Sequence, residues 1–392
     1  MKAGWQRKTI DAVCEVVNGG TPKTGLPDYW NGPHQWITPA EMGKRATPYI
    51  GQTERTLTDA GLQNSSARLL PAQSVILSSR APIGHLVINT MPMATNQGCK
   101  GLVPRDGLDC KYLYYYLTSI VPLLNDLGTG ATFKELSGGK LKEVPISVPP
   151  LPEQHRIVAI LDAAFDGIAT AKANAEQNLQ NARALFESHL QQVFTERGKG
   201  WVEKRLGEVC TITSNLVDPR KEEFRDLIHV GAANIEPQTG VFVGLKTARD
   251  EGLISGKFLF DESMVLYSKI RPYLMKVARP GFSGLCSADM YPLAPLPNQI
   301  TRDYLFHLLL SKPFTDYAIQ GSARAGMPKV NREHLFDFRV WLPDVEKQSE
   351  LSLKLDALHA ETQHLESLYR QKLTALGDLK RSLLHQAFSG QL

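Results

Sequence analysis

This 392-residue sequence has few of the features that mark exported, membrane or metal-binding proteins. It has five cysteines but no CxxC pair, which argues against a zinc ribbon and against a disulfide framework. No uninterrupted apolar run approaches the ~20 residues that a membrane-spanning helix needs. Residues 1–8 lack the apolar segment of a signal peptide. We therefore expect a soluble, cytoplasmic protein with no membrane partner.

Motifs for catalysis are also missing. The histidines form no HExxH or other metal-ligand spacing, and there is no GxSxG nucleophile elbow. The Asn/Asp-Pro-Pro-aromatic motif and the glycine-rich cofactor loop of DNA methyltransferases are absent. GGTPKT (19–24) fails the P-loop pattern, and the acidic residues of PDVEK (343–347) lie too close together for a nuclease metal site. We expect no catalytic residue, no metal and no cofactor in this chain.

The charge is nearly balanced overall but uneven along the chain. Lys and Arg number 44 against 40 Asp and Glu, a net charge of +4 that is compatible with nucleic acid without indicating it. Residues 60–105, 264–282 and 317–332 contain basic residues and no acidic ones. They mix Arg and Lys with Ser, Thr, Asn, Gln and Gly, which suits phosphate and base contacts. Each stretch can equally be an ordinary solvated loop.

The sequence repeats itself over about half its length. GWQRKTIDAVC (4–14) lines up with residues 200–210 at an offset of 196, and SVILSSR (74–80) with residues 263–269 at 189. Further matches follow in the same order, at 102–104 with 293–295, 112–113 with 304–305, and 188–194 with 382–388. The alternative is chance similarity between short apolar strings. Ordered matches in one phase favour an internal repeat with small loop insertions.

Each half changes from β-prone to helical sequence at a proline-marked boundary. The domains that we predict are 1–148 and 198–342, and the helical segments are 149–197 and 343–392. Apolar positions spaced by four and three from Ile157 and from Leu351 indicate a coiled-coil seam, with the polar Asn178 and Lys372 on it. We predict an α+β fold in which two β-rich α/β domains are joined by two long helices forming an antiparallel coiled coil, with internal pseudo-two-fold symmetry. In the alternative, each helix packs only on its own domain.

The sequence resembles a known family, the specificity subunits of type I restriction–modification systems. The resemblance covers essentially the whole chain. It is carried by GGTP (19–22), SSRAPIG (78–84), LPEQHRIVAILD (151–162), SKIRPYL (268–274), PKVNREHL (328–335) and SLLHQAFSG (382–390). The second helix opening departs from the pattern, because LPDVEKQ (342–348) replaces the tighter Leu-Pro-Glu-Gln string. That departure puts in doubt whether the two helix starts make equivalent contacts.

The resemblance implies a bacterial or archaeal protein that has no catalysis of its own and recognises double-stranded DNA. Each target-recognition domain would read one half of a split target, and the helix pair would set the spacing between the halves. The implied partners are two adenine-methylating subunits and the restriction subunits, which would carry S-adenosylmethionine, ATP and Mg. The candidate DNA contacts are Thr21, Lys23, Ser79, Arg80, Asn96, Gln97, Lys100, Thr129, Thr132 and Lys134 in the first domain, and Ser268, Lys269, Arg271, Tyr273, Ser322, Arg324, Lys329 and Asn331 in the second.

Two other functions remain compatible with the residues. One is a standalone DNA-modifying enzyme, which would bind S-adenosylmethionine without partners. The other is a two-domain adaptor that binds only proteins. Steep salt dependence of binding separates a DNA-binding protein from such an adaptor, because phosphate neutralisation releases counterions.

Overall fold

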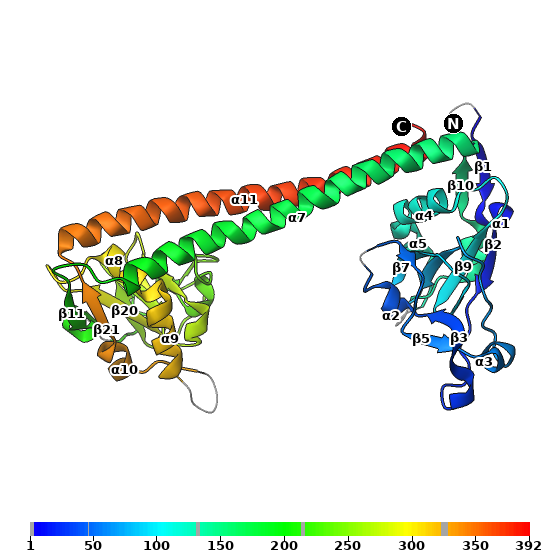
Figure 1. The fold of residues 1–392 in the computed structure, drawn as a ribbon. Coiled ribbons are helices and arrows are strands. Elements are labelled where there is room, and N and C mark those ends of the chain that lie inside the picture. Colours follow the sequence, from blue (N-terminus) through cyan, green and yellow to red (C-terminus); the bar gives the residue numbers. More distant parts are fainter. Residues whose placement is uncertain (1–3, 46, 131–133, 213–215, 323–327) are drawn as a thin grey trace. The chain divides into compact units, whose positions relative to one another are not determined.

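The computed structural model describes residues 4–45, 47–130, 134–212, 216–322 and 328–392. The chain forms two compact units (Figure 1). Unit 1 comprises Met1–Asn174 with Lys372–Leu392, and unit 2 comprises Ala175–Gln371. The helices α7 (Leu151–Thr195) and α11 (Val345–Ser389) pass through both units and pack together. The predicted fold class, two β-rich domains joined by two long helices, is confirmed.

Unit 1 is built on two sheets. The larger sheet has the strand order β2-β9-β6-β7-β4, the smaller has the order β5-β3-β8, and β1 pairs separately with β10. The elements of this unit before α7 are β1 (Gln6–Thr9), α1 (Ile10–Val13), β2 (Cys14–Asn18), η1 (Pro27–Tyr29), β3 (Trp30–Ile37), α2 (Pro39–Met42), β4 (Tyr49–Ile50), β5 (Arg55–Leu57), α3 (Asp59–Gln63), β6 (Val75–Ser79), β7 (Ile83–Asn89), β8 (Met93–Thr95), β9 (Cys99–Pro104), α4 (Cys110–Ser119), α5 (Val121–Leu127), α6 (Gly138–Glu143) and β10 (Pro145–Val148).

Unit 2 repeats the core of this plan, although several of its strands are shorter and its second sheet has two more strands. Its sheets have the orders β12-β20-β17-β18 and β13-β16-β19-β14-β15, and β11 pairs with β21 as β1 does with β10. The elements between α7 and α11 are β11 (Val202–Arg205), η2 (Leu206–Glu208), β12 (Cys210–Ile212), β13 (Leu216–Val217), β14 (Ile228–Val230), η3 (Ala232–Asn234), β15 (Lys246–Thr247), β16 (Lys257–Phe260), β17 (Val265–Ser268), η4 (Pro272–Leu274), β18 (Val277–Ala278), β19 (Gly284–Cys286), β20 (Met290–Pro295), α8 (Arg302–Leu310), α9 (Lys312–Gln320), α10 (Arg332–Asp337) and β21 (Arg339–Leu342).

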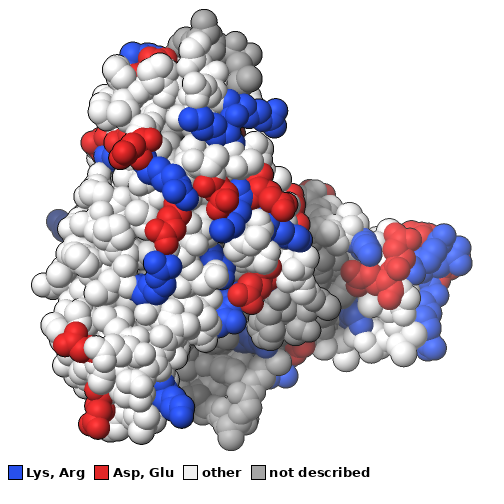
Figure 2. All heavy atoms as spheres, turned by 90° about the vertical axis from the view of Figure 1, so that its right-hand side faces the viewer, with Lys and Arg blue, Asp and Glu red and all other residues white. Residues whose placement is uncertain are grey.

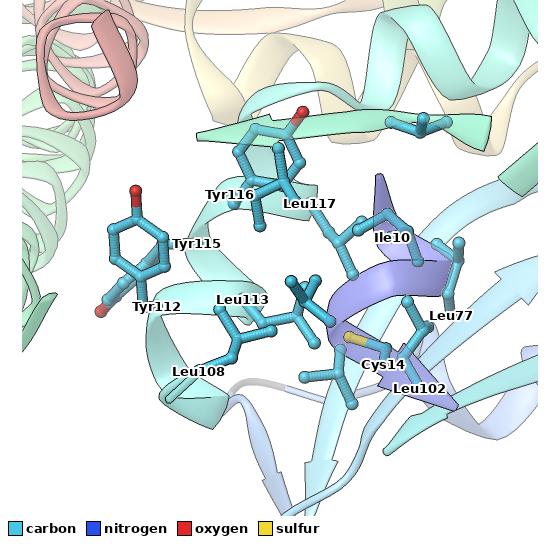
Figure 3. Packing of buried hydrophobic residues seen from close by; sticks show 14 of the residues in the cluster. Ile10, Cys14, Leu77, Leu102, Leu108, Tyr112, Leu113, Tyr115, Tyr116 and Leu117 are labelled. Carbon is cyan, nitrogen blue, oxygen red and sulfur yellow. The ribbon is translucent and has the colours of Figure 1, made fainter. Parts of the chain in front are cut away.

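The largest core of unit 1 lies between α4, the larger sheet and the long helices α7 and α11. Leu113 and Leu117 of α4 are fully buried on the side of the β-strands (Figure 3). Tyr112, also fully buried, packs on the ring of Phe388 of α11 at a centroid distance of 5.2 Å. Ile157 of α7 and Leu384 of α11 join the same cluster. At about 25 cal/mol per Å² of apolar surface, burial of such side chains is the main force holding the helices to the domain. The helices α7 and α11 therefore contribute side chains to the core of unit 1.

Strand pairing confirms the internal repeat and corrects one of its offsets. Val75 pairs with Leu102 in unit 1, and Val265 pairs with Leu293 in unit 2, so β6 and β17 match at an offset of 190. The offset of 189 inferred from the sequence is wrong by one residue. A slip of one residue moves every side chain to the other face of a strand. The backbone equivalent of Arg80 is therefore Ile270, not Lys269.

The helices α7 and α11 run antiparallel within each unit. In unit 1, Nη2 of Arg156 donates to the carbonyl of Leu392 at 2.8 Å, and Nζ of Lys380 lies 4.8 Å from the ring centroid of Phe165. In unit 2, Nε of Arg183 lies 3.0 Å from Oε2 of Glu366, and the rings of Phe186 and His359 lie 4.5 Å apart. In each unit, residue numbers thus rise along α7 as those of the facing residues fall along α11. The predicted antiparallel arrangement is confirmed.

The buried stripe on α7 keeps the predicted heptad positions at Ile157, Leu161, Ala175 and Ala182, but other positions after Ala175 shift by one residue. Leu185 is 46% exposed, whereas its neighbour Phe186 packs on the ring of His359 at a centroid distance of 4.5 Å. The seam positions predicted for Asn178 and Lys372 are wrong, because both residues are exposed. A regular α-helix has 3.6 residues per turn, so over several turns the contact stripe moves one residue beyond a strict 3.5-residue repeat.

The helices α7 and α11 begin with the same hydrogen-bonding arrangement. The amide oxygen of Gln154 accepts from the backbone N–H of Asp109 at 2.8 Å, and its amide nitrogen donates to the carbonyls of Gly107 and Pro149. Gln348 makes the equivalent bonds to Thr301, Gln299 and Pro343. Both glutamines are fully buried, so their amides must find these partners. The departure of LPDVEKQ from the family pattern therefore does not change the contacts of the second helix start. The two helix openings align at an offset of 194, that of Gln154 and Gln348.

Among the described residues, no helix is both long enough and apolar enough to cross a membrane.

Candidate nucleic-acid interface

Unit 1 brings several of the predicted polar residues together around the turn between β8 and β9. Oδ1 of Asn96 accepts a hydrogen bond from the N–H of Gly98 at 2.9 Å. A Cβ atom at position 98 would lie 3.2 Å from both Nε of Arg80 and Oδ1 of Asn96, so glycine lets these side chains approach. The hydroxyl of Thr21 donates to Oε1 of Gln97. Three distant segments therefore form one polar cluster.

The loop before α6 borders the same cluster. Thr129 and Glu135 exchange backbone hydrogen bonds of 3.0 and 2.9 Å, and the N–H of Leu136 donates to the carbonyl of Ser79 at 2.9 Å. Nη1 of Arg80 lies 3.7 Å from Oε2 of Glu135. Lys134 is exposed on this loop, whereas Thr132 lies outside the described residues. The predicted residues 129 and 134 are thus placed beside residues 79–80.

Two predicted residues of this cluster do not reach the surface. The hydroxyl of Ser79 is buried and has no hydrogen-bond partner among the described residues. Lys100 is 7% exposed, and burial lowers the pKa of its ammonium group, against the opposing charge of Glu135. Both side chains lie beneath the cluster. Lys23, on the same loop as Thr21, is exposed.

Unit 2 presents a corresponding cluster of different chemistry. The N–H of Val330 donates to the carbonyl of Lys269 at 2.8 Å, just as Leu136 donates to Ser79 in unit 1. Nζ of Lys329 lies 3.7 Å from Oδ1 of Asp289. Burial and the neighbouring Lys329 lower the pKa of Lys269. The position held by Glu135 in unit 1 is therefore basic in unit 2, where Lys329 occupies it.

The remaining predicted residues of unit 2 differ in accessibility. Arg271 and Tyr273 are exposed at the 3₁₀ turn η4, and the backbone of Arg271 is in the left-handed region at φ 51°. The side chains of Ser268 and Ser322 are buried. Oδ1 of Asn331 accepts from the N–H of His334 and caps α10. Arg324 lies outside the described residues.

The acid-free stretches of the sequence meet carboxylates from other parts of the fold. Arg68 lies 3.2 Å from Glu15, and Arg80 contacts Glu135. Figure 2 shows Lys and Arg interspersed with Asp and Glu on one face, without a single broad basic patch. The local potential is therefore weaker than the linear sequence suggested, and recognition would depend on particular side chains more than on net charge.

A pair of carboxylates, not predicted from the sequence, attaches the domains to the long helices α7 and α11. In unit 1, Asp162 of α7 accepts from Nζ of Lys111 at 2.7 Å and from the hydroxyl of Tyr115 at 2.5 Å. In unit 2, Asp356 of α11 contacts Nη2 of Arg279 at 2.7 Å and Nε2 of His307 at 2.9 Å. The two aspartates are 194 residues apart, the offset of Gln154 and Gln348. A search for charged residues at equal offsets would have found them.

His307 makes the unit 2 attachment sensitive to pH. Burial lowers the pKa of its imidazole below the ordinary 6.5, although the hydrogen bond to Asp356 acts in the opposite direction. As pH falls from about 7.5 to about 5.5, an unfolded histidine takes up a proton that His307 in folded unit 2 resists, so the folded state loses stability. We expect His307→Gln, which keeps a donor to Asp356, to reduce this loss. Thermal unfolding at both pH values checks it; an equal fall in Tm for the wild type and the variant would contradict it. His229 and His359, whose pKa values are also lowered by burial, remain in both proteins.

Among the residues that the structure describes, no group of three or more His, Cys, Asp and Glu side chains could hold a metal ion. The polar clusters of both units instead consist of amides, hydroxyls and basic groups on loops, carried by duplicated sheets. Such loops can recognise a polar polymer through hydrogen bonds and charge. The fold and the clusters define a duplicated recognition protein.

The chain belongs to the family of type I restriction–modification DNA specificity subunits. The family model, described as the type I restriction modification DNA specificity domain, matches residues 2–181 and again 198–375. In this family the specificity subunit is the non-catalytic component, and the cofactors are carried by the methylation and restriction subunits. The resemblance drawn from the sequence motifs is confirmed.

Individual proteins to which this chain is similar are also specificity subunits of type I restriction enzymes. The MjaIX specificity subunit of Methanocaldococcus jannaschii is 34% identical over 236 residues, which cover 56% of this chain and 55% of that protein. The EcoDI specificity subunit of Escherichia coli is 28% identical over 315 residues, 72% of this chain and 70% of that protein. The match thus spans about half the length of the first relative and more of the second.

Solved structures share the fold over the whole chain. A chain from a study of complex assembly and conformational transition of the type I restriction–modification system superimposes with a TM-score of 0.80 at 18% identity, covering 100% of this chain and 99% of that one. The HsdS subunit from Thermoanaerobacter tengcongensis gives a TM-score of 0.64 at 18% identity, covering 100% and 98%.

Proposed function

We propose that this chain recognises a bipartite DNA target and holds the enzymatic subunits of a type I restriction–modification complex on it. Unit 1 reads one half-site and unit 2 reads the other, and the helices α7 and α11 set the length of the spacer between them. The observation that carries this proposal is the duplication itself. The two units keep the same framework but differ in chemistry at equivalent loop positions, as at Glu135 and Lys329.

Shared and divergent parts of the repeat suit different roles. Gln154 and Gln348 make the same buried bonds, so the two helix starts keep one backbone framework, as expected if both present the same surface to two copies of one partner. The loop clusters differ, as expected of parts that read two different sequences. We infer that two methylation subunits bind and that restriction subunits join them. Because adenine methylation requires extrusion of the base into an enzyme pocket, the methylation subunit supplies that pocket.

The proposed DNA contacts are the accessible members of the predicted set. They combine exposed basic groups, which suit phosphates or guanines, with amides and hydroxyls that suit base edges. They are Thr21, Lys23, Arg80, Asn96, Gln97, Thr129 and Lys134 in unit 1, and Lys269, Arg271, Tyr273, Lys329 and Asn331 in unit 2.

The test is to express the chain with its cognate methylation subunit in a host lacking other adenine methylation. Methylome sequencing should then show one motif of two specific half-sites separated by a fixed number of unread base pairs. The methylation subunit expressed alone is the control and should leave no such motif. A contiguous motif would contradict the bipartite arrangement. If the motif is absent although the two proteins assemble, the chain is an adaptor and the proposal is wrong.

A further inference from the structure

Arg55 at the start of β5 is held against two indole rings in unit 1. Its guanidinium carbon lies 3.6 Å from the ring centroid of Trp30 and 5.3 Å from that of Trp36. The two indoles are themselves packed edge to face, with centroids 5.1 Å apart. Stacking on aromatic rings fixes the plane of a guanidinium group and leaves its N–H groups at the edge available. Arg55 is thus held in place although its side chain is exposed.

The indole platform is continuous with the polar cluster around Gly98. Nε1 of Trp36 donates to the carbonyl of Gly20 at 2.9 Å, and Nε1 of Trp30 donates to the carbonyl of Lys23 at 3.3 Å. The loop between these carbonyls contains Thr21, whose hydroxyl donates to Gln97. Arg55 therefore packs on the two indoles that hold the loop carrying Thr21 and Lys23, two of the proposed DNA contacts of unit 1.

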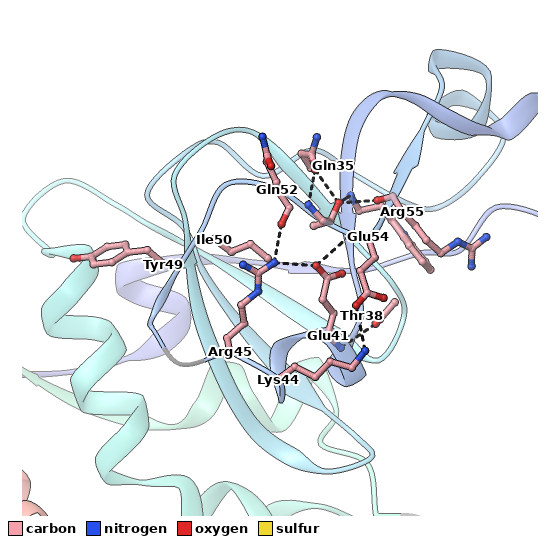
Figure 4. Close-up of polar contacts among 12 residues, drawn as sticks. Gln35, Thr38, Glu41, Lys44, Arg45, Tyr49, Ile50, Gln52, Glu54 and Arg55 are labelled. Carbon is pink, nitrogen blue, oxygen red and sulfur yellow. Dashed lines mark hydrogen bonds and ion pairs between the residues drawn. The ribbon is translucent and has the colours of Figure 1, made fainter. Parts of the chain in front are cut away.

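The guanidinium of Arg55 has no carboxylate partner among the described residues. Arg45, Arg68 and Arg80 of the same unit each contact a glutamate. Figure 4 shows the Arg55 side chain directed away from the neighbouring network of Glu41, Arg45 and Lys44. A stacked arginine whose hydrogen-bonding edge is free has the geometry for bidentate recognition of an external group.

The equivalent position in unit 2 has different chemistry. Arg55 pairs with Trp36 across β5 and β3, and Lys246 pairs with His229 across β15 and β14, so the repeat places Lys246 where Arg55 stands. The ring of His229 is hydrogen-bonded to Glu251 at 2.7 Å and offers no aromatic platform like that of the two indoles. Two units that read different half-sites should differ where they touch bases.

We propose that Arg55 is a specificity-determining residue that reads a guanine in the half-site recognised by unit 1. Two N–H groups of its guanidinium donate to O6 and N7 of that guanine in the major groove, the bidentate pairing that arginine geometry favours. Trp30 and Trp36 are positioning residues that hold the guanidinium plane. This inference rests on the proposed bipartite recognition of DNA and adds the residue and base of one contact.

The test compares methylomes of the complex carrying wild-type chain, Arg55→Lys or Arg55→Ala. The wild-type motif is determined first, so that failure of bipartite recognition is seen before any variant is read. We expect both variants to lose selectivity at one G·C pair of one half-site by about 5- to 150-fold, with the other half-site and the spacer unchanged. Arg68→Ala is the matched control, because Arg68 is an exposed arginine of unit 1 that is paired with Glu15. It should leave the motif as in the wild type.

Two outcomes would overturn the proposal. An unchanged motif in both variants would show that Arg55 reads no base. Weaker methylation at all sites with the motif intact would mark Arg55 as a phosphate contact. If Arg55→Ala abolishes methylation, Arg55→Lys decides, because lysine keeps the charge and cannot form the planar bidentate contact. A relaxed G·C position in that variant then supports the proposal, and a retained one contradicts it.

Discussion

Deleting residues 168–174 from α7 together with residues 373–379 from α11 should shorten the preferred DNA spacer and leave both half-sites unchanged. These segments lie opposite each other, since Phe165 packs on Lys380 and Arg183 contacts Glu366 further along. At 1.5 Å per residue the double deletion shortens the helix pair by about 10 Å, the rise of about three base pairs. Removing seven residues turns the remaining helix by only about 20°, so the buried faces still meet.

Methylome sequencing of the deletion variant with its methylation subunit measures the spacer directly. Deletion of residues 168–174 alone is the matched control. It displaces α7 against α11 without shortening the second helix, so we expect loss of packing and of methylation instead of a shorter spacer. An altered half-site with the original spacer would contradict a measuring role for the helices.

Most of the fold could be predicted because its signals are local or repeated. Proline-marked boundaries and the absence of β-prone runs beyond them located α7 and α11, and the equal offset of their apolar positions indicated that both belong to one repeat. The strand offset was missed because Arg80 and Lys269 are chemically similar, whereas hydrogen-bond register decides which residues are equivalent. Register depends on pairing with distant strands, which a short match between sequence strings does not contain.

The candidate interface could be predicted only in part, for a similar reason. Thr21, Asn96 and Gln97 were found by composition, and the fold brings them together. Arg55 was missed because Glu54 precedes it in the sequence, although in the fold Glu54 contacts Lys44. The pairing of Arg80 with Glu135 joins residues far apart in the sequence and depends on tertiary structure. Charge along a chain is therefore a weak guide to charge on a surface.

Asp356→Ala should loosen unit 2 more than Asp162→Ala loosens unit 1. Asp356 is contacted by Arg279, which is 22% exposed, and by His307, which is fully buried. Burial alone would raise the pKa of Asp356, but the bonds from His307 and Arg279 outweigh it and hold the pKa below its ordinary value. Removing the carboxylate leaves Arg279 paired only with Asp303 and leaves the buried imidazole of His307 without a hydrogen-bond partner. Because Asp356 is partly exposed, we expect a cost of about 2–3 kcal/mol, below that of a fully buried pair.

The unit 1 site supplies the matched control. Its aspartate is held by Lys111, whose ammonium can turn to solvent, and by the neutral hydroxyl of Tyr115. The loss from Asp162→Ala should accordingly be about 1 kcal/mol. Hydrogen exchange read by mass spectrometry separates the two units within the full chain. Amides of α8 in unit 2 should exchange about 30- to 150-fold faster in Asp356→Ala, and amides of α4 in unit 1 about 5-fold faster in Asp162→Ala.

The exchange pattern also distinguishes an attachment from a general stabilising contact. Asp356 joins α11 to α8, so its loss should affect α8 and the facing part of α11 first, with strands β17 and β20 following less. Equal acceleration throughout unit 2 would show that the carboxylate stabilises the whole fold without a particular role at the helix. If acceleration is confined to α8 and α11, the recognition domain is held to its spacer helix mainly through this carboxylate. The preferred spacer of Asp356→Ala should then broaden, while the bases read by unit 2 stay the same.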